Sequence, residues 1–156
     1  MGLLTDLLGD GGNGAYGLLA VTAHNPGSTL TASTGSGSLV DVDATNLAVT
    51  FTVPASGKVL VRLAAWSKIT SSTTGSEVRW GLREGAADVA NSTTPVSKIE
   101  NTNQRNAASI LITGLTPGAV KTWKWAHRTA SAAGTAYLYA GGSTGQAVME
   151  VEAVPA

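Results

Sequence analysis

The sequence has no cysteine and few charged side chains. The absence of cysteine excludes disulfide frameworks and cysteine-ligated metal sites, so the fold must be held by packing or by assembly. Charged residues make up only 13% of the 156 residues, against about 25% in an average soluble domain. Ser, Thr, Asn and Gly cover the surface instead. This composition suits a rigid β-rich particle component or an extracellular module better than a cytosolic enzyme.

Net charge and aromatic content are also low. Ten basic residues balance ten acidic ones, so no net field draws the protein to nucleic acid or to a membrane. Aromatic residues make up 5% of the chain, too few to favour the base-stacking platforms of single-stranded nucleic-acid binding. We therefore expect no nucleic-acid partner and no membrane partner.

Long apolar runs are missing as well. The first ten residues have no basic region and too short an apolar run for a signal peptide. No stretch approaches the roughly 20 apolar residues of a transmembrane helix. The length suits one domain with a proper core. The sequence thus predicts a soluble single-domain protein made in the cytoplasm.

Residues 1–15 differ from the rest in their residue pattern and are predicted to form an N-terminal arm with a glycine hinge. Four leucines recur there at helical spacing, and they are Leu3, Leu4, Leu7 and Leu8. A helix of one or two turns is marginal alone, so the leucines need a groove on their own domain or on a partner. The run Gly9 to Gly14 matches G-x-G-x-x-G, but no strand precedes it and no helix pattern follows, so a hinge is favoured over a dinucleotide site.

Residues 16–156 show a pattern of strands and turns. In L-A-V-T-F-T-V the apolar residues Leu47, Val49, Phe51 and Val53 alternate with small or polar ones, which is the period of a β-strand. Similar runs recur at roughly the 8–12-residue spacing of sandwiches and barrels, and no helical pattern interrupts them. The sequence predicts an all-β fold, an antiparallel two-sheet jelly-roll-type sandwich of eight to ten strands. An immunoglobulin-like or fibronectin-like sandwich is the alternative, although its usual length leaves too much of the chain unexplained.

Two strands carry candidate contact residues. In T-W-K-W-A-H-R, Trp123, Trp125 and His127 share one face, which must be covered by the opposite sheet or by a neighbouring subunit. In the strand after Lys58, the odd positions are uniformly apolar, whereas the even positions mix charge with large apolar groups. The candidate subunit-interface residues are Leu60, Arg62, Trp66, Trp123 and Trp125. Packing of Trp66 on its own core is the alternative.

No pattern predicts a catalytic, cofactor or metal site. Asp41 and Asp43 would share one face of a strand, as a hard-cation site requires, but solvated acids explain them as well. His24 and His127 lack the spacing of metal ligands and are not accompanied by a local nucleophile motif. We expect no cofactor and no enzymatic activity.

Four phrases carry a resemblance to a known family. They are V-D-V-D-A-T-N-L-A-V-T-F-T-V-P-A-S-G-K-V-L-V-R-L, W-G-L-R-E-G, T-W-K-W-A-H-R and L-Y-A-G-G-S-T-G-Q-A-V-M-E-V. Over about residues 16 to 154 the chain resembles a β-sandwich domain found in virion proteins of tailed bacteriophages that infect actinobacteria, usually described as minor tail or capsid decoration proteins. The resemblance carries no catalytic motif. It implies a structural protein of the virion, made in the host cytoplasm and often trimeric.

A compact domain with a short arm suits a decoration protein on the outer capsid surface. The resemblance then implies two partners, the major capsid protein and further copies of the same chain in a homotrimer. The leucines of the arm would bind the major capsid protein or an adjacent copy. One alternative is a minor tail protein that binds a host-surface glycan through Trp66 or loop aromatics. A second alternative is a cell-wall hydrolase that uses His127 or Asp43.

Overall fold

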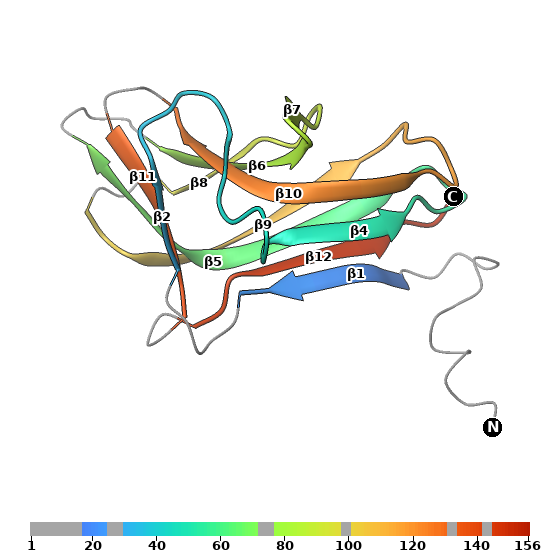
Figure 1. Ribbon diagram of the computed structural model, residues 1–156, viewed down its shortest axis with the longest axis horizontal. Helices are drawn as coiled ribbons and strands as arrows, with labels where there is room; N and C mark the ends of the chain where they lie inside the picture. Colours follow the sequence, from blue (N-terminus) through green and yellow to red (C-terminus); the bar gives the residue numbers. More distant parts are fainter. Residues whose placement is uncertain (1–16, 25–29, 72–76, 98–100, 131–133, 142–144) are drawn as a thin grey trace.

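The computed structural model describes residues 17–24, 30–71, 77–97, 101–130, 134–141 and 145–156. These residues form strands in two antiparallel sheets that pack face to face, and none of them is helical (Figure 1). The predicted all-β sandwich is therefore confirmed. Within the described ranges there is no helix long and apolar enough to cross a membrane. The predicted arm and hinge, including Leu3, Leu4, Leu7 and Leu8, lie outside the described residues.

Twelve strands are present in the described part of the chain. They are β1 (Gly17–Ala23), β2 (Leu30–Thr34), β3 (Val40–Asp41), β4 (Ala48–Thr52), β5 (Val59–Ser71), β6 (Val78–Glu84), β7 (Ala87–Asp88), β8 (Thr94–Ser97), β9 (Gln104–Ile112), β10 (Val120–Thr129), β11 (Gly134–Ala140) and β12 (Val148–Ala153). The number exceeds the predicted eight to ten. Two of the twelve, β3 and β7, are only two residues long.

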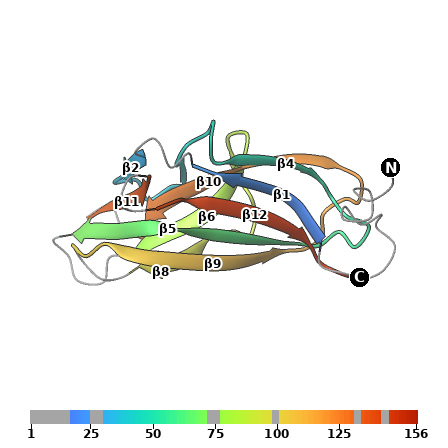
Figure 2. The ribbon, with the colours of Figure 1, turned by 90° about the horizontal axis from the view of Figure 1, so that it is seen from below.

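The two sheets have a mostly jelly-roll connectivity. Sheet A has the order β1-β12-β5-β11-β2, with β9 on the other edge of β5. Sheet B has the order β3-β10-β6-β7, and it also contains β4 beside β10 and β8 beside β6. Figure 2 shows β1, β12, β5 and β9 side by side in sheet A. These four strands face β4, β10, β6 and β8 in the strand order of a jelly roll. The remaining strands β2, β3, β7 and β11 are additions to that plan.

The 13-residue strand β5 runs the length of sheet A. Along one side, residues 59–64 pair with β12 and residues 66–71 pair with β11. Along the other side, residues 59–67 pair with β9. Its odd positions Val59, Val61 and Leu63 are at most 1% exposed, as the alternating pattern predicted. The even positions therefore point away from the core, on the outer side of sheet A.

Aromatic side chains of sheet B fill much of the core. Trp123 packs edge to face on Phe51, with ring centroids 4.9 Å apart, and Trp125 packs in the same way on Trp80 at 4.8 Å. Trp80, Trp123 and Trp125 are all fully buried within the single chain. The prediction that Trp123 and Trp125 lie at a subunit interface is therefore wrong, because the opposite sheet covers both side chains. The alternation predicted for T-W-K-W-A-H-R is correct.

Two turn glycines provide a matched test of the packing between strands. Gly57 and Gly85 have similar positive φ angles of 64° and 61°. A Cβ atom at Gly57 would lie 2.6 Å from the carbonyl oxygen of Leu115, whereas a Cβ at Gly85 would meet nothing within 4 Å. Gly57 also accepts a hydrogen bond from the Leu115 N–H over 3.1 Å. The turn before β5 thus needs glycine for space as well as for backbone conformation.

We expect Gly85→Ala to lower the free energy of unfolding by about 1–2 kcal/mol, the cost of a left-handed conformation for an L residue. Gly57→Ala should lower it further, because the backbone at Leu115 has to move as well. Urea unfolding followed by tryptophan fluorescence measures both values. Equal losses in the two variants would contradict the close approach at Leu115.

Candidate interaction face

The outer side of sheet A brings residues of five strands into register. Across the sheet, Leu60 lies between Leu111 on β9 and Glu152 on β12, and Arg62 lies between Ser109 and Glu150. Farther along β5 follow Ala64, Trp66 and Lys68 with their neighbours. We call this surface the outer face. It has a leucine half, formed by Leu18, Val21, Leu60, Arg62, Ala64, Ala107, Ser109, Leu111, Val148, Glu150 and Glu152, and a tyrosine half, formed by Trp66, Lys68, Arg105, Tyr137 and Tyr139.

Large apolar side chains of the leucine half are in contact with solvent. Leu18, Val21 and Leu111 are each 54% exposed. Leu18 and Leu60 both flank Glu152 in the strand register, and Leu111 lies beside Leu60. Such a group is unusual on a surface that needs only to be soluble, and it is typical of a contact with another molecule.

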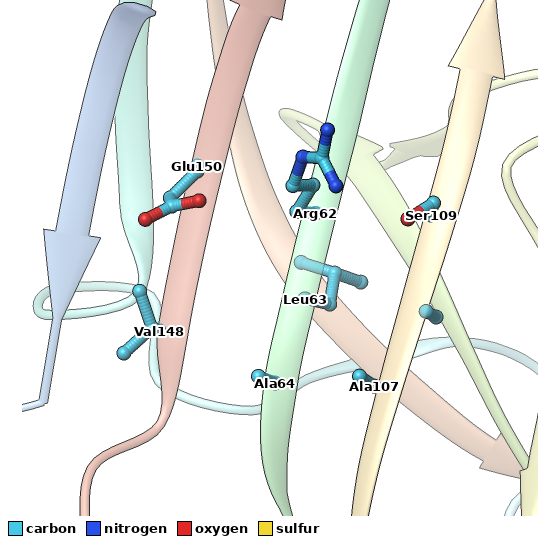
Figure 3. A pocket seen from close by; sticks show the side chains of 8 residues that line it. Arg62, Leu63, Ala64, Ala107, Ser109, Val148 and Glu150 are labelled. Carbon is cyan, nitrogen blue, oxygen red and sulfur yellow. The ribbon is translucent and has the colours of Figure 1, made fainter.

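A depression of about 340 Å³ lies in the leucine half. Figure 3 shows Arg62 between Glu150 and Ser109, with Ala64 and Ala107 in the next row. Because Ala64 and Ala107 pair directly across β5 and β9, two short side chains lie together, and their longer neighbours form the rim. The depression therefore results from the two alanines that lie side by side on β5 and β9.

The charges of the leucine half are partly paired. The Arg62 guanidinium donates hydrogen bonds to the two carboxylate oxygens of Glu152 over 2.9 and 3.3 Å. This hydrogen bonding, with the nearby charges of Glu152 and Glu150, raises the pKa of Arg62. Arg62 therefore remains a cation at the edge of the depression.

The tyrosine half combines aromatic rings with two cations. The rings of Tyr137 and Tyr139 are stacked, with centroids 5.9 Å apart and planes 4° apart. The Lys68 Nζ lies 5.2 Å from one ring centroid and 5.6 Å from the other. Trp66 lies between Tyr139 and Arg105 in the strand register. These side chains can stack on flat or apolar groups while presenting positive charge.

The outer side of sheet B has a different character. Asp41 accepts hydrogen bonds from Arg83 over 2.9 Å and from Lys124. At the end of the inner side, Lys121 lies 3.0 Å from Glu84. These oppositely charged side chains neutralise one another within the chain, so sheet B has fewer groups left for a partner.

The predicted interface residues of β5 are accessible from outside the sandwich. Leu60, Arg62 and Trp66 lie together on the outer face, and all three are partly or largely exposed. Their contact with another subunit remains a prediction.

The two aspartates considered for a cation site are not brought together. Asp41 belongs to the ion pairs of sheet B, whereas Asp43 accepts hydrogen bonds from the backbone N–H groups of Thr45 and Asn46 over 3.0 and 2.9 Å. Burial raises the pKa of Asp43, but these hydrogen bonds, a third from the Asn46 side chain and the charge of His24 outweigh it and lower the pKa overall. Within the described ranges, no three His, Cys, Asp or Glu side chains could share a metal ion.

The two histidines lie in separate environments. The His24 Nδ1 is 3.7 Å from a carboxylate oxygen of Asp43. His127 is 1% exposed and follows Trp125 on the inner side of β10. Burial lowers the pKa of His127 to about 4. His127 is therefore a neutral core residue near pH 7.

Several residues of the outer face were not found from the sequence. Leu111 stands within the continuous apolar run Ile110 to Ile112, where alternation is hidden. Tyr137 and Tyr139 are two residues apart in T-A-Y-L-Y-A, and this spacing was the signal that could have placed them on one face.

Comparisons with known proteins give little further information. No protein-family model matches the chain, and no curated protein matches it. Among solved structures, the chain is similar to a family two carbohydrate esterase from Cellvibrio japonicus, with 18% sequence identity and a TM-score of 0.27. The similarity covers 88% of this chain and 36% of the esterase chain, so the chain spans about a third of the esterase's length. At this TM-score the similarity supports no inference about function.

The buried histidine predicts a pH dependence of stability. The unfolded chain takes up a proton near the usual pKa of 6.5, whereas the folded chain does so only near pH 4, so His127 favours unfolding as the pH falls between these values. We expect its contribution to reach about 3 kcal/mol at pH 4. In His127→Leu, the free energy of unfolding should fall less steeply over this range when measured in urea. Parallel pH profiles for the two proteins would contradict the burial of a neutral imidazole.

Proposed function

We propose that the chain is a non-enzymatic structural protein of a tailed-phage virion, a capsid decoration protein that assembles as a trimer on the outer capsid surface. Its partners are the major capsid protein and two further copies of itself. The proposal begins from the resemblance in sequence over residues 16 to 154. The observation that supports it most is the outer face of sheet A, with three large apolar side chains that are each 54% exposed.

Physical chemistry favours a protein surface as the partner of the leucine half. Apolar side chains, an arginine and few unpaired charges are typical of the central part of protein interfaces. Burial of each leucine would contribute about 1.5–3 kcal/mol before ordering costs. Small contributions of this size become effective when many copies bind one lattice. A decoration protein is bound in that way.

A second candidate is a minor tail protein that binds a host-surface glycan. The tyrosine half favours it, because Tyr137, Tyr139 and Trp66 provide aromatic surface beside the cations Lys68 and Arg105. The two candidates differ in where the protein lies on the particle. Immunogold labelling of virions distinguishes them, since a decoration protein labels the head and a minor tail protein labels the tail.

Deleting residues 1–12 should leave a folded protein that no longer occupies capsids. The four leucines of the arm are lost, whereas the sandwich keeps its core. Co-sedimentation with capsids lacking the protein measures occupancy, and thermal unfolding checks the fold. A full-length variant with all four arm leucines changed to Ser keeps the length of the arm. It tests whether the leucine side chains themselves are needed for binding. Full occupancy by the truncated protein would contradict a role of the arm.

Leu111→Asp should dissociate the trimer into folded single chains. A carboxylate in the leucine half cannot be buried without a partner, and its desolvation opposes assembly. Analytical ultracentrifugation should show the wild-type protein at about three times the 15.7 kDa of one chain and the variant at one chain.

The control is Val120→Asp on sheet B, where Val120 is 67% exposed. It should leave the trimer unchanged, because it lies away from the outer face of sheet A. Equal masses for Leu111→Asp and wild type would show that the leucine half is not the subunit contact.

A further inference from the structure

We propose that the leucines of the arm, Leu3 to Leu8, dock on the leucine half of a neighbouring copy, over the depression at Ala64 and Ala107. This inference deepens the proposed function, because it names the surface that receives the arm. It makes the arm and the outer face two sides of a single contact between copies. Three observations support it.

The first observation is where the described chain begins. Gly17, the first residue of β1, pairs with Ala153 at the end of sheet A, and β1 then runs toward the row of Val148. β1 therefore begins at the end of sheet A and runs toward the depression. To lie over the depression of its own copy, the arm would have to run opposite to β1. A depression on a neighbouring copy sets no such condition, and 16 residues reach up to about 50 Å.

The second observation is the match between apolar groups. The depression of about 340 Å³ has Ala64, Ala107 and Val148 in its lining, and Leu18, Leu60 and Leu111 lie in the adjoining rows. The arm offers four leucines on one stripe if it is helical, which is the shape that an apolar groove accepts from a short amphipathic segment. Both sides lose apolar surface to water in the contact.

The third observation is the match in charge. The arm carries Asp6 and Asp10 and no basic residue. On the outer face, Arg105 donates to the backbone carbonyl of Gln146 over 2.8 Å, and Lys68 lies over tyrosine rings. Neither cation has a carboxylate partner among the described residues. These two cations complement the aspartates of the arm, which have to lie on the side of the tyrosine half because the carboxylate of Glu150 lines the depression itself.

A contact of this kind would join unlike surfaces. Such a contact is heterologous, and repeated by rotation it closes into a ring in which every copy gives one arm and receives one. A trimer is a ring of this kind. The same geometry leaves sheet B free of subunit contacts.

Engineered disulfides test the docking directly, because the natural chain has no cysteine. The variants combine Ala107→Cys with either Leu4→Cys or Leu7→Cys, since a disulfide needs Cα atoms about 5.5 Å apart and two arm positions cover the register. The purified full-length proteins are oxidised with diamide in the absence of capsids. Non-reducing electrophoresis should show covalent dimers and trimers in at least one pair, at least tenfold above the single-cysteine variants.

The matched control pairs Leu7→Cys with Thr122→Cys, which is exposed on the outer side of sheet B. It should give no covalent oligomer above the single variants. Equal oligomers in the control would mean random collision and would overturn the proposal. Loss of both thiols without any oligomer would mean that the arm binds its own copy, and the absence of any disulfide would mean that it does not bind here. Either result overturns the proposal.

The inference rests on the proposed function, but the two can fail separately. Covalent oligomers from a protein that never binds capsids would leave the docking in place and contradict the role in decoration. Capsid binding without covalent oligomers would support the role in decoration and contradict the docking.

Discussion

The packing of three tryptophans between the sheets is the constraint on which the rest of the molecule depends. Trp80, Trp123 and Trp125 stand on the neighbouring strands β6 and β10, and each is fully buried. Truncation of such a side chain to alanine typically costs about 3–5 kcal/mol. A slip of β10 by one residue would expose both of its tryptophans and bury Lys124. The register of sheet B is therefore fixed, and Arg83 and Lys124 are forced to the outer side, where both pair with Asp41.

Sheet A has aliphatic side chains on its inner side and exposed apolar side chains on its outer side. Since sheet B supplies the aromatic bulk, the inner side of sheet A needs only aliphatic side chains such as Val61, Leu63 and Met149. No demand of the core explains why Leu18 and Leu111 stay 54% exposed on the other side. Solubility would favour polar residues at both positions. Their exposure is the reason why we propose a contact with a partner on the outer side of sheet A.

Local patterns in the sequence predicted much of the fold and a part of the candidate site. Alternation placed Leu60, Arg62 and Trp66 on the side of β5 away from the core, and the structure agrees. The same alternation could not decide whether Trp123 and Trp125 meet the opposite sheet or another subunit, because a period of two assigns residues to a common side without saying what covers it. The pairing of β5 with β9, β11 and β12 is non-local. The juxtaposition that makes the depression, Ala64 beside Ala107, therefore had no local signal.

The energetics of the arm explain why such a contact would depend on assembly. Four buried leucines contribute about 6–12 kcal/mol, and fixing the six residues from Leu3 to Leu8 costs roughly the same amount in backbone entropy. One arm on one face is then close to neutral. In a closed ring, each contact is made within an assembly that the other two already hold together, so the effective concentration of arm and face rises steeply. Binding of several copies to one lattice raises it again. A weak arm of this kind thus favours complete rings over partial assemblies.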